Sequence, residues 1–378
     1  MLIREKRDKA IVWIIIGLLV LTALACFIYA YYLCNMLDSQ YEAERWAGDS
    51  GEPFAQISCF MPADGKLKMT DINKFRTAAA KKLEEASIEI SNDKPPFIDC
   101  WSCEDSTKVY GEYSGTADVI ACGGNFFDFH PLKLVTGNYF SGSDLMQDNV
   151  LLDEDLAWLI FGGNDLEGMT VYIYNYPFRV AGVVAREADQ ATDKAYSGGL
   201  GLFMSYDSYM ELNTVQPEAE AKDEASEDSS NISKYGISCY EMCMPEPVSG
   251  FAYGVAEAEF PKGGEIVQNT GRFELKKLAA IAKDFSVRSI HADVTYSYWE
   301  NAARYAENKA AMFLAIGAVC CLGPVIIFLI LLFRNLAFTN RYIQEDVMPK
   351  VLDSVEESIR VRQRARWEKK HRYKEKKE

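Results

Sequence analysis

The chain has 378 residues and a formal net charge of −15 at pH 7, and 49% of its residues are hydrophobic. This length allows more than one folded unit. The excess of acidic residues argues against nucleic-acid binding, which depends on basic patches, so no nucleic-acid partner is expected.

Two uncharged stretches are each long enough to cross a lipid bilayer as a helix. Residues 10–33 contain no charged side chain, and residues 310–333 form a second such stretch. A helical span needs about 20 apolar residues. A secretory signal peptide is the alternative for the first stretch, but its apolar run is too long and no small-x-small cleavage site follows. We therefore predict transmembrane helices at residues 10–34 and 310–333.

The charges indicate on which side of the membrane each segment lies. Residues 1–9 carry four basic side chains, and residues 334–378 carry 13 Lys/Arg against 8 Asp/Glu. The segment between the spans carries 45 acidic and 23 basic residues, a net charge of −22. Basic segments next to a span stay in the cytoplasm. We therefore predict a protein of the cytoplasmic membrane, with a basic N-terminus at 1–9, an extracytoplasmic domain at 35–309 and a cytoplasmic tail at 334–378.

The first part of the outer segment alternates between strand and helix patterns. Residues 35–50 are expected to prolong the first span as a helix before the chain breaks. Residues 56–60 and 119–122 read as strands, and residues 70–86 between them as an amphipathic helix. The apolar stripe of that helix consists of Ile72, Phe75, Ala79 and Leu83. This order predicts an α+β domain, and its length suits two subdomains.

Residues 137–184 contain a regular succession of strand, helix and hairpin. Residues 149–152 form a short apolar strand, and Asp153 can cap a helix whose first turn is acidic. That helix is expected to end at Gly162, where a left-handed residue is needed. Residues 169–174 and 178–184 then read as two strands around a turn at 175–177.

The second part of the outer segment contains further elements and one insertion. We expect strands at 202–206, 237–244 and 251–255, a helical turn at 208–212, a helix at 273–283 and a strand or connector at 289–294. Residues 298–305 should lead as continuous helix into the second span. Residues 216–234 are acidic and almost free of apolar side chains, which predicts a disordered surface insertion. They lack the carboxylate spacing and turn glycine of a calcium loop.

Cysteines in the outer segment permit disulfides without fixing their connectivity. On one strand, Cys239 and Cys243 would be too far apart to pair with each other. Cys100 and Cys103 have the spacing of a redox motif but do not open a helix that would lower a thiol pKa. Structural or free thiols are therefore the preferred interpretation for this pair. The six cysteines of the outer segment are Cys59, Cys100, Cys103, Cys122, Cys239 and Cys243.

The sequence contains no known catalytic motif. A phosphate loop, HExxH, GxSxG and a zinc-type Cys/His cluster are all missing. The three histidines, His130, His291 and His371, are scattered and are interpreted as structural or solvated. Neither span contains an ionisable residue, which argues against a transport path through these two helices alone. We predict a non-catalytic protein with no cofactor and no catalytic, cofactor-binding or metal-binding residue.

The tail combines an apolar stripe with a basic stretch. The stripe is followed by residues 360–370, which are rich in arginine and lysine. The favoured interpretation is a helix that lies on anionic membrane lipid. The alternative is a docking helix for a cytoplasmic partner. The stripe consists of Val347, Val351, Leu352, Val355 and Ile359.

Residues 137–184 resemble the extracytoplasmic core domain of MacB-type ABC transporter permeases, and the order of basic end, helix, outer domain and helix is also similar to that family. The positions that carry the resemblance are Gly137, Tyr139, Phe140, Asn149 to Leu152, Leu156, Ala157, Phe161, Gly162, Gly168, Val171, Ile173, Pro177, Phe178, Val180, Gly182, Val183 and Val184.

The resemblance implies a permease-family subunit of a mechanotransmitting ABC system, in which an ATPase drives movement of the outer domain through the membrane helices. Because a phosphate loop is missing, the ATPase is expected to be a separate chain. A partner permease chain or a homodimer is also expected. The family's permeases have four spans and two are found here, which implies half of a split permease or an accessory subunit. The alternative function is a membrane-anchored extracytoplasmic sensor, receptor or scaffold without transport activity.

Overall fold

The structure is a computed structural model that describes residues 2–48, 52–62, 65–86, 88, 95–142, 144, 146–196, 199–215, 235–283, 294 and 296–375. It divides into two compact units, of which one comprises Ile28–Leu314 and the other Met1–Phe27 together with Ala315–Glu378. The acidic insertion predicted at 216–234 lies outside the described residues, as does almost all of the strand or connector predicted at 289–294.

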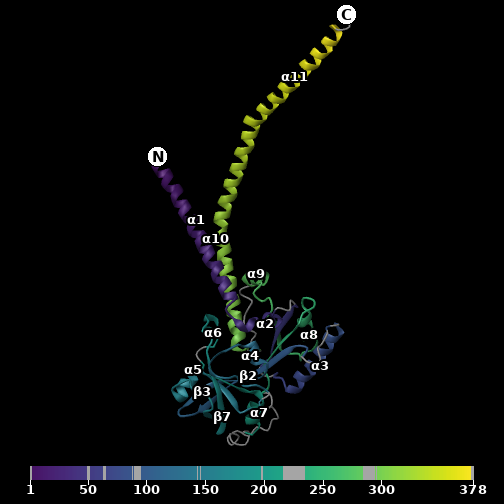
Figure 1. Cartoon of the computed structure of the whole chain (residues 1–378). Coiled ribbons are helices and arrows are strands. Elements are labelled where there is room, and N and C mark those ends of the chain that lie inside the picture. Colours follow the sequence, from purple (N-terminus) through teal and green to yellow (C-terminus); the bar gives the residue numbers. More distant parts are fainter. Residues whose placement is uncertain are drawn as a thin grey trace. The chain divides into compact units, whose positions relative to one another are not determined.

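A single mixed sheet runs through the unit Ile28–Leu314 (Figure 1). Its strand order is β10-β1-β9-β2-β3-β8-β5-β7-β4, and β6 pairs with β2 and β7. The β3–β8 and β5–β7 pairs are parallel and the others antiparallel. The strands are β1 (Phe54–Phe60), β2 (Ile98–Tyr110), β3 (Ser114–Gly124), β4 (Lys133–Gly137), β5 (Asn149–Asp153), β6 (Thr170–Ile173), β7 (Tyr176–Ala185), β8 (Gly201–Ser205), β9 (Cys239–Pro245) and β10 (Glu265–Gln268).

Helices cover both faces of this sheet, which confirms the α+β class. One apolar cluster joins one face to α3 (Met69–Glu85), α5 (Glu154–Phe161), α7 (Tyr206–Val215) and α8 (Phe251–Glu259). The cluster on the other face includes residues of α2 (Glu42–Ala47), α4 (Phe126–Phe129) and the first turn of α10 (Tyr298–Tyr342). Two further helices, α6 (Gln190–Ala195) and α9 (Leu275–Lys283), lie in the same unit, near α10 in Figure 1.

Several predicted elements are confirmed with their core residues. In α3, the four side chains of the predicted stripe are the buried ones. In α5, the Asp153 carboxylate accepts a hydrogen bond from the Leu156 backbone N at 2.7 Å, and the helix ends at Gly162 with φ 73°. The following hairpin turns through Tyr174 and Asn175, both with positive φ, one residue before the predicted turn. Two consecutive residues with positive φ are typical of a tight two-residue hairpin loop.

The segment 251–255 was expected to be a strand, and this prediction is wrong because the chain forms α8 there. The Glu246 carboxylate accepts hydrogen bonds from the backbone N of Gly250 and of Ala252, which satisfies donors that a helix N-terminus leaves free. Ala252, Val255 and Ala256 then share one buried face at helical spacing.

The prolongation of the first helix over residues 35–50 is also wrong. Helix α1 (Leu2–Cys34) ends where predicted for the span, and a 3-10 turn at Asp38–Gln40 and the short α2 follow. The bend buries Leu37 in a cluster with Ala302, Ala303 and Ala306 of α10. A straight helix would carry Leu37 away from this cluster. By contrast, the expected helical connection from residue 298 into the second span is confirmed, because α10 is continuous.

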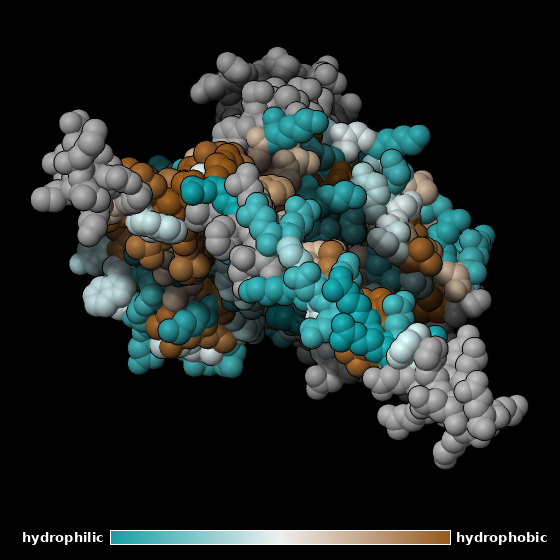
Figure 2. Space-filling view, turned by 90° about the horizontal axis from the view of Figure 1, so that it is seen from above, coloured by the Kyte–Doolittle hydropathy of each residue, from teal (hydrophilic) through white to brown (hydrophobic). Residues whose placement is uncertain are grey.

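Two helices are long and apolar enough to be candidate membrane spans. They are Ala10–Cys34 of α1 and Tyr298–Ala337 within α10, each with a mean hydropathy of 2.9. Only 11% and 6% of their most apolar windows are buried in the protein, so these hydrophobic side chains stay on the surface. Brown, hydrophobic residues are accordingly plain on the face seen in Figure 2. A π-helical turn at Ile343–Val347 and α11 (Met348–Glu375) follow α10.

Two glycines with positive φ form a matched pair for a stability test. At Gly137 (φ +75°) an added Cβ would lie 2.1 Å from the Ala181 carbonyl oxygen, whereas at Gly162 (φ +73°) it would meet nothing within 4 Å. Gly162→Ala should therefore lower the free energy of unfolding by about 1–2 kcal/mol, the cost of the left-handed conformation alone. Gly137→Ala should lower it by about 3 kcal/mol or more, because the strand pair must also move. Urea unfolding of the full chain in detergent, followed by tryptophan fluorescence, measures both losses, and equal losses would contradict the clash.

Asp153 gives the fold a specific pH dependence. Burial raises the pKa of its carboxyl from its ordinary value of about 4 to about 6, although hydrogen bonds from the backbone N of Leu156 and Gly201 oppose the shift. The folded state therefore binds this proton more tightly than the unfolded chain does. The resulting stabilisation is complete below about pH 4 and is lost as the pH rises through about 6, with an upper limit of about 3 kcal/mol.

Asp153→Asn should remove this part of the pH dependence, since the amide keeps a capping oxygen but does not titrate. Denaturant unfolding at pH 4 to 7 measures the slope, with the exposed neighbour changed by Asp155→Asn as the control. An unchanged slope in Asp153→Asn would show that Asp153 is not the group responsible.

Candidate functional site

Arg272 is a charged side chain with only 4% of its surface exposed, in the turn between β10 and α9. Its guanidinium contacts both carboxylate oxygens of Glu300 at 2.8 and 3.2 Å and both of Glu307 at 3.1 and 3.3 Å. It also donates to the side-chain oxygen of Gln40 at 2.6 Å. These five contacts use the five N–H donors of an arginine, so the buried cation is fully hydrogen-bonded.

The two carboxylates come from the outer turns of α10. Glu300 and Glu307 lie seven residues apart and therefore on one face of the helix, with Arg304 between them. Arg304 contacts Glu300 at 2.7 Å and Glu265 of β10 at 2.8 Å. Thus α10 is tied to the edge of the sheet by two arginines as well as by apolar packing.

Polar contacts continue from Arg272 to β1 and β9, the second and third strands from one edge of the sheet. Gln40, from the turn that follows α1, also accepts a hydrogen bond from the side-chain amide of Asn269 at 2.9 Å. Asn269 contacts the hydroxyl of Ser58 in β1 at 2.9 Å. That hydroxyl donates to the Glu241 carboxylate in β9 at 2.7 Å, since a charged oxygen is the stronger acceptor.

We call the buried residues Gln40, Ser58, Glu241, Asn269, Arg272, Glu300 and Glu307 the junction network. All seven have exposed fractions of 5% or less. They connect the chain after α1, the outer turns of α10, the β10–α9 turn and two strands of the sheet. The junction network is therefore a polar link from the ends of both apolar helices to β9, within the unit Ile28–Leu314, which we call the outer unit.

The electrostatics of the network depend on its pairing. Burial alone would lower the pKa of the Arg272 guanidinium, but the carboxylates of Glu300 and Glu307 outweigh burial and raise that pKa. Removing two or three charges from water costs several kcal/mol per ion, and only close, well-directed pairing offsets that cost. The position of α10 relative to the sheet within this unit is therefore set by polar geometry that tolerates little displacement.

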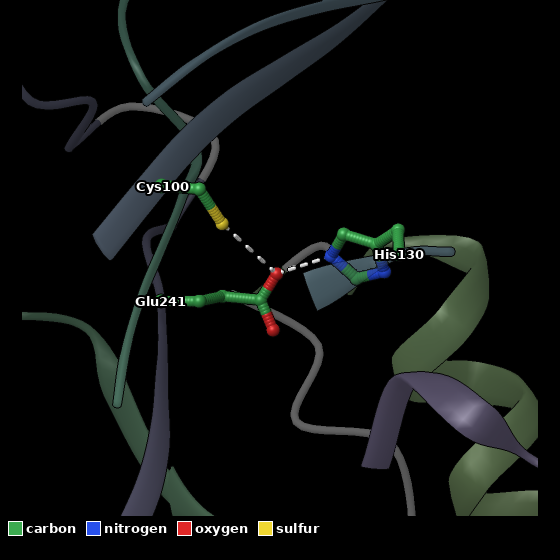
Figure 3. A group of neighbouring side chains, drawn as sticks. All are labelled: Cys100, His130 and Glu241. Atoms are coloured by element: carbon green, nitrogen blue, oxygen red, sulfur yellow. Dashed lines mark hydrogen bonds and ion pairs between the residues drawn. The ribbon is translucent and has the colours of Figure 1, made fainter. Parts of the chain in front are cut away.

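The network ends in a group of three side chains with different chemistry (Figure 3). His130 Nε2 lies 2.5 Å from Glu241 Oε2, and Cys100 Sγ lies 3.8 Å from the same oxygen. Burial, with the charge of Glu241 as a second cause, raises the pKa of the Cys100 thiol well above its ordinary value. Cys100 is therefore a poor nucleophile. Within the described residues, this is the group whose donor atoms fit a metal ion.

All ten cysteines are free, so none of the disulfides that the even number permits is formed. Cys100 and Cys103 lie in the apolar clusters of opposite sheet faces and cannot pair. Both lie on β2 rather than at a helix start, as expected.

Sequence reasoning found the elements of this site but missed its members. It treated the histidines as scattered, yet the fold brings His130 beside residues 100 and 241. His291 lies outside the described residues, and the side chain of His371 is not described. The one local signal was the spacing of Glu300, Arg304 and Glu307, which places three charges on the face of a helix that otherwise packs through alanines.

Comparison with known proteins gives one family match and several similar structures. The family model described as MacB-like periplasmic core domain matches residues 13–231, more than half of the chain. No curated protein matches at comparable significance.

Three of the similar solved structures are compared with this chain by their sequence identity, the share of each chain that is covered and the TM-score. The periplasmic region of MacB from Actinobacillus actinomycetemcomitans is 18% identical, with 62% of this chain and 94% of that chain covered and a TM-score of 0.36. The extracellular domain of the noncanonic ABC-type transporter YknZ from Gram-positive bacteria is 13% identical, with 57% and 99% covered and a TM-score of 0.36. A domain of a putative permease protein from Porphyromonas gingivalis is 14% identical, with 57% and 86% covered and a TM-score of 0.28.

Arg272→Met should destabilise the outer unit by about 3–5 kcal/mol, because it leaves two buried carboxylates without a partner. The control is Arg360→Met, which breaks an exposed pair with Glu356 and should change the free energy of unfolding by about 0.5 kcal/mol or less. Denaturant unfolding of the full chain measures both.

A triple variant separates loss of pairing from loss of packing. Arg272→Met combined with Glu300→Gln and Glu307→Gln carries no buried charge at this point and should recover much of the lost stability. If Arg272→Met were no worse than Arg360→Met, the junction network would not hold α10 in place.

Proposed function

The chain belongs to the family of the MacB-like periplasmic core domain, and on that premise we propose that it is a non-catalytic permease-type subunit of an ABC transporter. A separate ATPase subunit supplies the energy. Movement at the cytoplasmic side passes along the membrane helices and displaces the outer domain. The chain itself supplies no ATP-binding residues in this proposal, in agreement with the missing phosphate loop.

The observation that carries the proposal is the way α10 enters the outer unit. It is one helix of 45 residues that includes both the apolar stretch and the outer turns with Glu300 and Glu307. Its outer end is held by Arg272 instead of by a flexible linker. A displacement of the helix would therefore reach β1 and β9 through the junction network. A simple membrane anchor has no need for such a connection.

We propose the orientation in which both termini are cytoplasmic, supported by the basic residues at 1–9 and 334–378. Helix α11 then lies at the inner membrane surface. Its apolar stripe is exposed, with Val351, Leu352, Val355 and Ile359 each 46–59% accessible, and the arginines that follow suit anionic lipid headgroups. Lipid is thus the proposed partner of α11, and a cytoplasmic protein remains the alternative.

We further propose that the domain at 35–309 consists of two subdomains that share the sheet. Helix α3 packs against α8 at one end, where β10, β1 and β9 lie (Figure 1). Helix α5 contacts β5, β7 and β8 toward the other end and also β3, next to the proposed boundary. The proposed boundary is the parallel β3–β8 pair.

A partner permease chain or a second copy of this chain completes the membrane part in our proposal. The spans at 10–34 and 310–333 contain no ionisable side chain, and two such helices alone do not form a transport path. Movement of the outer domain then acts on substrate outside the membrane.

The proposal is tested by purifying the tagged full chain from its native membranes in mild detergent. An ATP-binding protein should copurify, and ATP analogues should change the hydrogen exchange of amides in β1 and β9. A complex whose ATPase binds but cannot hydrolyse ATP is the control for effects of nucleotide alone.

Recovery of the chain without any ATP-binding protein would refute the transporter proposal. If the accessibility of α11 instead changed with an extracytoplasmic ligand in the absence of an ATPase, the chain would be a sensor or receptor. If an ATP-binding protein copurifies but hydrogen exchange in β1 and β9 is the same with and without nucleotide, the chain is an ABC subunit whose outer domain is not driven through α10.

A further inference from the structure

Three different metal-ligand types meet at one point inside the outer unit (Figure 3). Cys100 comes from β2, Glu241 from β9, and His130 from the residue that follows α4. One donor atom from each lies within 4.8 Å of the other two. The residues are 1–3% exposed, so their polar atoms are turned away from bulk water. Residues from three separate elements, distant in sequence, thus converge where the junction network meets the apolar cluster that contains Cys100.

One of the two contact distances already equals that expected around a bound zinc ion. Zinc lies about 2.3 Å from a cysteine sulfur and about 2.0–2.2 Å from histidine nitrogen or carboxylate oxygen, which places tetrahedral ligand atoms about 3.3–3.8 Å apart. Cys100 Sγ and Glu241 Oε2 are already 3.8 Å apart. His130 Nε2 and Glu241 Oε2, at 2.5 Å, need to separate by about 1 Å. The proposal therefore requires the His130 ring to shift between Phe126 and Trp299, which pack against it at ring-centroid distances of 4.6 and 4.3 Å.

The summed charge of the three ligands matches that of a divalent cation. A thiolate, a carboxylate and a neutral imidazole together carry two negative charges, which one divalent ion neutralises. The ion would also offset the cost of burying the Glu241 carboxylate away from water. A set with sulfur, nitrogen and oxygen ligands suits zinc better than calcium or magnesium, which prefer oxygen alone.

Surrounding residues hold the ligands in place. The Ser58 hydroxyl donates to the other carboxylate oxygen of Glu241 at 2.7 Å. The His130 ring is fixed between Phe126 and Trp299, with ring centroids at 4.6 and 4.3 Å. Such outer contacts orient ligands in metal sites and commonly affect affinity ten- to hundredfold.

A cavity borders His130, one of the three residues of the group. It has a volume of about 350 Å³, and both His130 and Trp299 line it. The buried Trp299 Nε1–H has no hydrogen-bond partner among the described residues. Carboxylates and two basic side chains also line the cavity, namely Asp38, Glu187, Asp189, Lys133 and Arg186.

We propose that Cys100, His130 and Glu241 bind one zinc ion, with water from the cavity as the fourth ligand. The ion joins β2 and β9 to the turn after α4 and fixes the carboxylate at which the junction network ends. This site does not depend on the proposed transport function, because its ligands lie within one compact unit and require no ATPase.

The test uses the purified full chain in detergent, with reductant, after removal of metals by a chelator. Zinc should rebind at one equivalent per chain, and this binding should require Cys100. Elemental mass spectrometry measures the bound zinc. Cobalt in place of zinc should give tetrahedral d–d bands and a sulfur-to-cobalt charge-transfer band in the near ultraviolet. The cobalt spectrum needs no variant and reports thiolate ligation directly.

Variants then assign the ligands. Cys100→Ser should abolish the charge-transfer band, and Ser58→Ala should weaken zinc affinity about ten- to hundredfold. The matched control is Cys122→Ser, a thiol equally buried on the same sheet face but outside the group, which should bind like the unchanged protein. Chelator should lower the thermal unfolding midpoint of the unchanged protein and of Cys122→Ser. It should not change the midpoint of Cys100→Ser.

Two results would overturn the proposal. One is a folded chain that shows neither the charge-transfer band nor a response of its unfolding midpoint to zinc. The other is equal zinc content in Cys100→Ser, His130→Gln and Cys122→Ser. In either case the three residues form a hydrogen-bonded cluster only.

Discussion

The structure depends on how the charge of Arg272 is accommodated inside the outer unit. A guanidinium without water needs every donor paired, and here the partners come from α10 and from the turn after α1. Because these partners belong to segments far apart in sequence, the turn, the helix and the sheet edge must assemble together. The fold around β1 and β9 follows from the same requirement, since Asn269 and Ser58 extend the pairing to Glu241.

Much of the architecture was predictable from local pattern. The stripe of α3 and the caps of α5 rest on residues a few positions apart, so a helical period and a capping aspartate were enough to place them. The spans followed from length and charge alone. The resemblance of residues 137–184 to the MacB-type core domain agrees with the family match, which covers that stretch.

The site could not be predicted in the same way, because its contacts cross long stretches of sequence. His130 and Glu241 are 111 residues apart, and no motif links them. Local pattern also failed where tertiary context decides: residues 251–255 are apolar enough for a strand, but the Glu246 cap and the core side of Ala252 and Ala256 favour a helix. Leu37 is buried only because the chain bends after α1.

The different endings of the two apolar helices have a mechanical consequence. A continuous helix carries torsion as well as axial force, and α10 is continuous to Tyr298, so a rotation about its axis reaches Glu300. Helix α1 stops at Cys34 and is followed by a bend, and the chain after that bend reaches Arg272 through Gln40. In the proposed transporter, α10 would therefore transmit rotation to the outer unit, and the segment after α1 would act only as a tether.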